Sequence, residues 1–203
     1  MKRYILVWLL IICFLTGCAV TENGADDSIE SKPSYFFPPQ TVSQTYKGSV
    51  LDLAVQEDEF DISVTEVKRF EEGSLYQLEL DCNEKIQDGY GVDRRHLGFF
   101  MVLGDRIYLI HDEDEFETVE EITDAGTLVC SEEGKKDTLD ENTRGWHEYI
   151  LADGSRREYH GYNDLTETGY YECFVWELGK GLVEYRSGYG AESDAIQLFL
   201  TEE

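Results

Sequence analysis

The chain has 203 residues, of which 43 are Asp or Glu and only 17 are Lys or Arg, so its formal charge at neutral pH is −26. An acidic surface repels the phosphates of nucleic acids and of anionic lipid headgroups, which argues against both as charge-driven partners. The charge favours a cationic partner, either a basic protein or a divalent metal ion.

The first 18 residues have the pattern of an export signal. Lys2 and Arg3 precede an apolar run of 12 residues, from Tyr4 to Leu15. A membrane-spanning helix needs about 20 apolar residues, so this run has the proportions of the apolar part of a signal peptide. The sequence Leu15-Thr16-Gly17-Cys18 ends the run and resembles the lipobox of bacterial lipoproteins.

The resemblance to bacterial lipoproteins implies a lipid anchor. A diacylglyceryl group would be attached to the sulfur of Cys18, residues 1–17 would be removed, and the mature chain would begin at the lipidated cysteine. One acyl chain binds a bilayer reversibly, whereas two hold stably, because each buried methylene contributes about 0.8 kcal/mol. We therefore expect a protein anchored in a cell membrane through Cys18, with its body on the extracytoplasmic side.

Two regions are expected after the signal peptide. Residues 18–46 should form the lipidated cysteine and a flexible tether, because the stretch is mostly polar and contains all three prolines of the chain. The aromatic residues 35–37 are the exception, and either dock on the body or bind another molecule. Residues 47–203 contain no proline, which suits continuous strands, and should form a single β-rich domain.

Turn residues divide this domain into about ten short β-type segments. The pattern predicts an antiparallel meander of hairpins, closed as an open barrel or stacked as a sandwich. The expected strands cover residues 50–55, 60–67, 75–80, 97–103, 106–110, 146–151, 156–162, 170–178, 182–187 and 195–200.

Short glycine-containing loops predict the register of two hairpins. Two-residue loops at 104–105 and 179–180 fix which residues lie opposite each other. The predicted pairs are Phe100 with Leu109, Phe174 with Tyr185, and Trp176 with Val183. The first hairpin is apolar on both faces, so we expect it in the middle of the sheet.

One helix is expected near residues 114–125. Phe116, Val119 and Ile122 lie three apart, Asp114-x-x-Glu117 has the spacing of a capping box, and Gly126 can end the helix. The acidic residues around its start are typical of a solvated helix, and the sequence has no EF-hand spacing.

The sequence contains no catalytic or cofactor-binding motif of the GxSxG, HExxH, P-loop or GxGxxG type. No catalytic residue and no cofactor are therefore assigned. Once Cys13 is removed and Cys18 lipidated, Cys82, Cys130 and Cys173 remain and allow at most one disulfide, whose pairing is open. For Cys173 we expect a buried, inert thiol.

A metal site is predicted on the hairpin of 146–151 and 156–162. If Asp153-Gly154 forms a two-residue loop, His147 lies opposite His160, with Cβ atoms about 5 Å apart. Glu158 shares the face of His160, because side chains two apart in a strand point the same way. His147, His160 and Glu158 are thus the predicted ligands of a divalent metal. The alternative is a pair of half-exposed histidines without a metal.

Three functions remain in competition. The favoured one is a membrane-anchored binding or accessory module without catalysis. The alternatives are an envelope hydrolase or metal-dependent enzyme, and a carrier of an apolar ligand in a half-open β-barrel. A cavity lined by Phe99, Phe100, Phe174 and Trp176 would favour the carrier, and a cleft with one histidine and two carboxylates would favour the enzyme. A dry core with a flat aromatic or acidic face would favour the binding module.

Overall fold

The structure is a computed structural model that describes residues 36–37, 44–52, 54–81, 96–111, 116–140, 142–166, 169–189 and 194–201. All of them belong to one compact unit, Ser31–Glu203. Residues 15–18, Cys82 and Asp114 lie outside the described residues. No helix in the described part of the chain has the length and apolar character needed to cross a bilayer.

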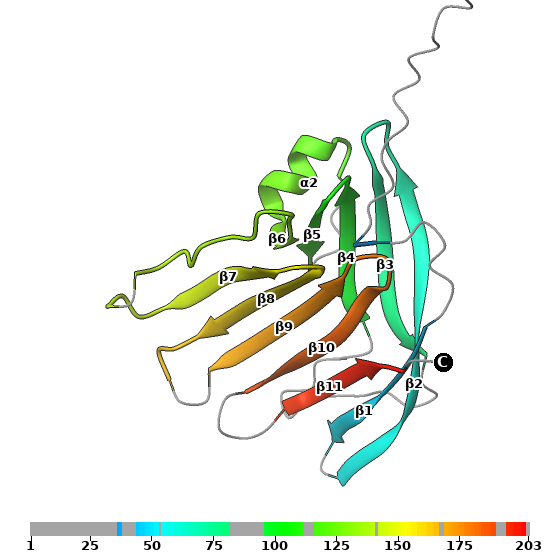
Figure 1. The fold of residues 1–203 in the computed structure, drawn as a ribbon, viewed down its shortest axis with the longest axis vertical. Coiled ribbons are helices and arrows are strands. Elements are labelled where there is room, and N and C mark those ends of the chain that lie inside the picture. Colours follow the sequence, from blue (N-terminus) through cyan, green and yellow to red (C-terminus); the bar gives the residue numbers. More distant parts are fainter. Residues whose placement is uncertain are drawn as a thin grey trace, which may run out of the picture. The chain divides into compact units, whose positions relative to one another are not determined.

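Eleven strands form one antiparallel sheet in the described residues (Figure 1). The strands are β1 (Gln44–Asp52), β2 (Ala54–Arg69), β3 (Ser74–Asp81), β4 (His96–Leu103), β5 (Arg106–Ile110), β6 (Thr127–Cys130), β7 (Trp146–Asp153), β8 (Arg156–Asn163), β9 (Tyr170–Glu177), β10 (Gly181–Tyr189) and β11 (Asp194–Leu200). Their order is β6-β5-β4-β3-β2-β1-β11-β10-β9-β8-β7, so two meanders meet at the pairing of β1 with β11. The predicted antiparallel, mainly β fold with one short helix is confirmed.

The sheet curves until its two edges approach each other. Strand β6 contacts β8, and the Arg157 Nε of β8 donates a hydrogen bond to the Ser131 carbonyl just after β6, at 2.9 Å. Residues 131–140, which we call the closing segment, run alongside β7. There Lys135 and Ile150 exchange both backbone hydrogen bonds, at 3.0 and 2.9 Å. The sheet is therefore a nearly closed barrel and not a sandwich.

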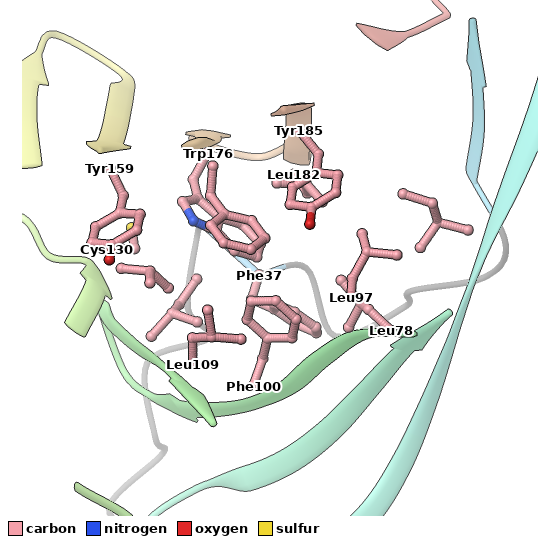
Figure 2. Close-up of a cluster of buried hydrophobic side chains, with 14 of the residues drawn as sticks. Phe37, Leu78, Leu97, Phe100, Leu109, Cys130, Tyr159, Trp176, Leu182 and Tyr185 are labelled. Carbon is pink, nitrogen blue, oxygen red and sulfur yellow. The ribbon is translucent and has the colours of Figure 1, made fainter. Parts of the chain in front are cut away.

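Aromatic side chains fill the space inside the curve. Phe100 of β4 packs edge-on against Phe174 and Trp176 of β9, with ring centroids 5.5 and 5.7 Å apart. All three side chains are fully buried. Figure 2 shows residues of β4 and β5 pointing across the interior toward those of β8, β9 and β10. This core holds the two halves of the sheet together.

Part of the predicted tether belongs to this core. Phe37 stacks on Tyr76 at 4.6 Å and lies 5.9 Å from Trp176, and both Phe36 and Phe37 are only 4% exposed. The aromatic residues at 36–37 thus dock on the body. The sheet itself begins at Gln44, before the predicted domain boundary at residue 47.

The helix α2 (Val119–Ala125) lies within the predicted range, but its cap differs from the expected one. Thr118 is the N-cap and forms a capping box with Glu121, whose side chain accepts from the Thr118 N–H at 3.0 Å. Gly126 ends the helix by donating to the Ile122 carbonyl at 2.8 Å, as predicted. Ile122 packs with Phe99 and other side chains on the second face of β3–β5.

The hairpin at residues 97–110 is not where it was expected in the sheet. Both faces of this hairpin are buried, but β5 pairs with the edge strand β6 and β4 follows β5, so the hairpin lies near one edge of the sheet and not in its middle. Helix α2, and not a second layer of sheet, covers the outward apolar face. Apolar character on both faces therefore did not distinguish the two arrangements.

Strand boundaries were wrong in two places. The expected strand at 50–55 spans the end of β1, at Asp52, and the beginning of β2, at Ala54. Strand β6, only four residues long, was not predicted at all. A short strand at a sheet edge carries too few alternating positions to be detected by periodicity.

The three hairpins differ in how well their register was predicted. Phe100 pairs with Leu109 and Phe174 with Tyr185, as expected. Trp176 lies opposite Leu182 and not Val183, because β10 has a register shift between Leu182 and Glu184.

The register of the hairpin between β7 and β8 was wrong by two residues. Asp153 pairs with Arg156, so the loop consists of Gly154 and Ser155 and not of Asp153 and Gly154. His147 consequently lies opposite Tyr162, and Tyr149 lies opposite His160.

Candidate functional site

Strands β7–β10 carry a continuous group of aromatic, charged and thiol side chains on the side away from the filled interior. Tyr159, Phe174 and Tyr185 are buried in the core, so their neighbours along the strands point outwards. We call this surface the outer face; it consists of Tyr149, Arg156, Glu158, His160, Tyr162, Cys173, Val175, Glu184 and Arg186. Because His160 pairs with Cys173 and Cys173 with Arg186, these three residues form one row across the strands.

Stacked rings occupy the β7–β8 side of the outer face. Tyr149 stacks on His160 with ring centroids 4.8 Å apart, and His147 stacks on Tyr162 at 4.7 Å. Tyr149 also meets Tyr162 edge-on at 6.3 Å. Cross-strand aromatic pairs of this kind hold each ring in a fixed orientation. Each of the two imidazoles is therefore packed against a tyrosine ring of the outer face.

Paired charges occupy the β8–β10 side. Glu184 accepts Arg156 Nη2 at 2.9 Å and lies 2.8 Å from Arg186 Nε. Glu158 lies 3.8 Å from Arg156 Nε and 3.9 Å from Arg186 Nη2. Two carboxylates thus face two guanidinium groups, and together these long side chains cover Val175, which is fully buried. This part of the surface is locally neutral despite the acidity of the whole chain.

Glu158, His160 and Cys173 bring a carboxylate, an imidazole and a thiol together between these two regions. His160 Nε2 lies 2.8 Å from Glu158 Oε1, and one ligand atom from each residue lies within 4.8 Å of the other two. Arg186 Nη2 approaches the Cys173 sulfur at 3.6 Å. Burial raises the pKa of the Cys173 thiol to about 12, and the Arg186 charge opposes this only in part. The free thiol is therefore protonated at neutral pH and is not a poised nucleophile.

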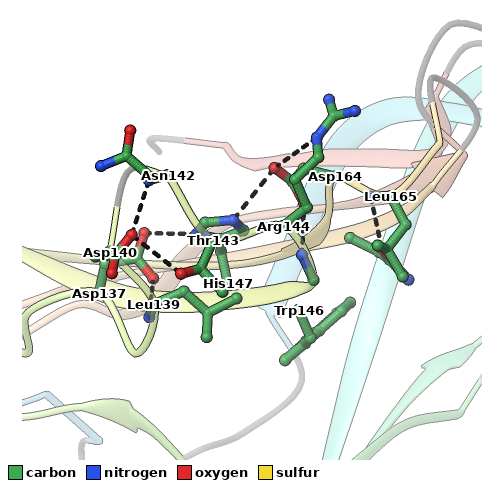
Figure 3. A network of polar contacts seen from close by, with 12 residues as sticks. Asp137, Leu139, Asp140, Asn142, Thr143, Arg144, Trp146, His147, Asp164 and Leu165 are labelled. Atoms are coloured by element: carbon green, nitrogen blue, oxygen red, sulfur yellow. Dashed lines mark hydrogen bonds and ion pairs between the residues drawn. The ribbon is translucent and has the colours of Figure 1, made fainter.

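His147 lies in a separate network, which we call the His147 cluster (Figure 3). Its Nδ1 is 2.9 Å from Asp137 Oδ2, in the closing segment, and its Nε2 is 3.4 Å from Asp164 Oδ2. Asp164 also accepts a hydrogen bond from the Gly145 N–H at 2.6 Å. The buried imidazole thus joins the closing segment to strand β7 and to the chain after β8.

The electrostatics of the His147 cluster favour the charged forms. The hydrogen bond with Asp137 and the charges of both aspartates raise the pKa of His147, against the effect of burial. The pKa of Asp137 is lowered, because hydrogen bonds from His147 and the Leu139 N–H outweigh its desolvation. The Gly145 N–H is the main cause that lowers the pKa of Asp164. The pKa of His147 is raised because both of its ring nitrogens face carboxylates.

The predicted metal ligands are separated into two groups. Glu158 and His160 lie together, as expected from their spacing in one strand, whereas His147 belongs to the cluster with Asp137 and Asp164. Cys173 lies beside Glu158 and His160 in its place. A metal at these residues stays a prediction.

Sequence reasoning missed Cys173 as a member of this group, although a signal was present. Phe174 was predicted to pair with Tyr185, and because neighbouring side chains in a strand point to opposite faces, Cys173 had to lie on the other face of the sheet. The Cys173 thiol is buried, as expected. Cys130 and Cys173 are both free, so the disulfide between these two cysteines does not form. The two pairings with Cys82 lie outside the described residues.

Comparison with known proteins gave no match, whether with family models, with curated proteins or with solved structures. Function therefore has to be inferred from the N-terminal sequence, the barrel-like sheet and the outer face.

Proposed function

We propose that the protein is a lipid-anchored binding module without catalysis, held in a cell membrane through Cys18 with its body on the extracytoplasmic side. The outer face is its binding surface. The observation that carries this proposal is the contrast between an interior filled by the protein's own aromatic rings and an outer face with fixed, partly exposed tyrosines and histidine. The resemblance of Leu15-Thr16-Gly17-Cys18 to a lipobox supports the anchor.

The state of the candidate catalytic groups supports a role without chemistry. A general base needs a ring nitrogen free to reach a substrate proton, and both nitrogens of His147 face aspartates. The Cys173 thiol is buried and protonated. One histidine with two carboxylates is present, but as a cross-link between segments.

The charge and the rings together define the partner class. A chain with a formal charge of −26 attracts cationic proteins over long distances. On the outer face, Tyr149 and Tyr162 offer ring surfaces over which a Lys or Arg side chain can lie, a contact that contributes about 0.5–1 kcal/mol at exposed sites. The proposed partner is a basic protein segment.

Site-specific crosslinking tests the binding surface. A photoreactive amino acid is placed at Tyr149 in the full-length chain and, as a control, at Val67, which is 50% exposed on β2. We expect position 149 to give a crosslink to a basic polypeptide in living cells, position 67 to give none, and Tyr162→Ala to weaken the first. Identical products from both positions, or no product from position 149, would contradict the proposal.

A second candidate, an apolar-ligand carrier, is favoured by one observation. Phe36 and Phe37 lie outside the sheet and yet occupy its interior, so the interior accepts an apolar group that is not part of a strand. A carrier would bind a fluorescent fatty acid saturably, and removing both rings with Phe36→Ala/Phe37→Ala would change that affinity. If neither protein binds the probe saturably, the carrier function is excluded.

A further inference from the structure

We propose that Glu158, His160 and Cys173 form a binding site for a thiophilic divalent transition metal, with zinc as the best match. This site lies within the outer face, but the proposal does not depend on protein binding there, because it needs only three side chains of two neighbouring strands. It retains Glu158 and His160 from the sequence-based prediction and replaces His147 with a thiol.

The backbone places these three donors correctly. Glu158 and His160 are two apart on β8 and so share a face, and Cys173 lies directly opposite His160 on β9. In a tetrahedral zinc site the donor atoms are about 3.3–3.8 Å apart, as follows from metal–ligand bonds of about 2.0–2.3 Å. The present separations, 2.8 Å for Glu158 to His160 and at most 4.8 Å overall, bracket that range. Movements of the donor atoms by about 1 Å bring these separations to the tetrahedral values. The strand register does not have to change.

The donor set selects the kind of metal. A thiolate and an imidazole favour zinc, cobalt or copper, whereas calcium and magnesium take oxygen ligands. The Glu158 and His160 side chains are 26% and 24% exposed, while Cys173 is 2% exposed. An ion can therefore enter from solvent past the carboxylate and imidazole and meet the sulfur below them. A water molecule completes the fourth position on the exposed side.

The surroundings of the three ligands are also prepared for a metal. Tyr149 stacks on the His160 ring and restricts its orientation. When the ion binds, Cys173 loses its thiol proton to solvent and the thiolate coordinates. Arg186 then moves away from the sulfur, toward Glu184, which already lies 2.8 Å from it. Arg186 is thus a competitor of the metal.

Cobalt binding to the full-length chain, purified in detergent, tests the site. Co²⁺ bound by a thiolate gives an intense charge-transfer absorption, so we expect this band in the wild-type protein and its loss on displacement by Zn²⁺. Cys173→Ser should abolish the band, whereas Cys130→Ser, which changes another buried thiol, should keep it. His160→Ala removes a ligand and should therefore weaken Zn²⁺ binding by more than the roughly 10–100-fold typical of losing a residue that only orients a ligand, and His111→Ala should leave it unchanged.

One further variant decides the outcome if Cys173→Ser does not fold. Glu158→Gln, at the solvent-exposed side of the site, should weaken Zn²⁺ binding. The proposal is overturned if the wild-type protein gives no cobalt–thiolate band, if the band persists in Cys173→Ser, or if Glu158→Gln binds Zn²⁺ as tightly as the wild type.

Discussion

Replacing Phe37 by alanine should destabilise the body as strongly as a substitution in the middle of the sheet. Phe37 is 4% exposed, and its ring lies 4.6 Å from Tyr76 and 5.9 Å from Trp176. Removal of a buried phenylalanine ring costs about 3–5 kcal/mol, because the transfer free energy is lost and a cavity remains. Most domains have only about 5–15 kcal/mol of stability. A single substitution in the predicted tether would thus remove a large fraction of it.

Urea unfolding followed by tryptophan fluorescence measures this effect, because Trp176 is one of the neighbours of Phe37. Phe199→Ala is the matched control: the same side chain is removed from β11, where it is 42% exposed. We expect the control to lose about 1 kcal/mol or less. If both variants lose the same free energy of unfolding, Phe37 is not part of the core and the segment is a simple tether.

Three other predictions concern the anchor, the His147 cluster and the seam of the sheet, where β1 pairs with β11. Cys18→Ala should move the protein from the membrane fraction to the soluble fraction, and an unlipidated variant that stayed in the membrane would rule out the lipid anchor. His147→Asn should cost most stability between about pH 4 and pH 6.5 in urea unfolding. The raised pKa of His147 means that its contribution is complete below the unfolded value of about 6.5 and is lost as pH rises through the folded value. The lowered pKa of Asp137 means that its contribution is complete above about 3.9 and is lost as pH falls through the folded value; a pH-independent loss would contradict the ion pair. Gly48→Ala should lower the free energy of unfolding by at least about 2 kcal/mol relative to Ser49→Ala, because the added Cβ would lie 1.8 Å from the Gln197 carbonyl oxygen.

The accuracy of the sequence-based register depended on how tightly each loop constrains its strands. At residues 104–105 the loop that begins with its glycine was predicted, and the pairing of Phe100 with Leu109 was correct. At residues 153–155 the single Gly154 is compatible with two neighbouring loops, and the structure uses the second one. When the loop shifts by one residue, each residue of β7 pairs with a residue two positions further along β8. Every side chain therefore stays on its predicted face, but His147 lies opposite Tyr162 and not His160.

The candidate site divides in the same way into local and long-range parts. The proximity of Glu158 to His160 is a property of one strand and could be predicted. The pairing of His160 with Cys173 depends on the register between β8 and β9, and the connection between these strands is too long to define it. Asp137 reaches His147 only because the closing segment lies alongside β7, and the hydrophobic periodicity of the sequence does not predict that arrangement. Phe36 and Phe37 gave a visible signal as apolar residues in a polar stretch, but their destination depended on the finished core.

The seam between β1 and β11 has a consequence for how the chain acquires its structure. The seam pairs Tyr46 with Leu200, so strands from opposite ends of the described chain lie side by side in the middle of the sheet. During synthesis the first meander, β1 to β6, is complete long before its partner β11 has emerged. Contacts between residues so distant in sequence make folding slow, because a long loop must close before they form. Until β11 arrives, β1 is an unpaired edge that can pair with another chain. We therefore expect the nascent protein to be most prone to aggregation just before its last strand is made.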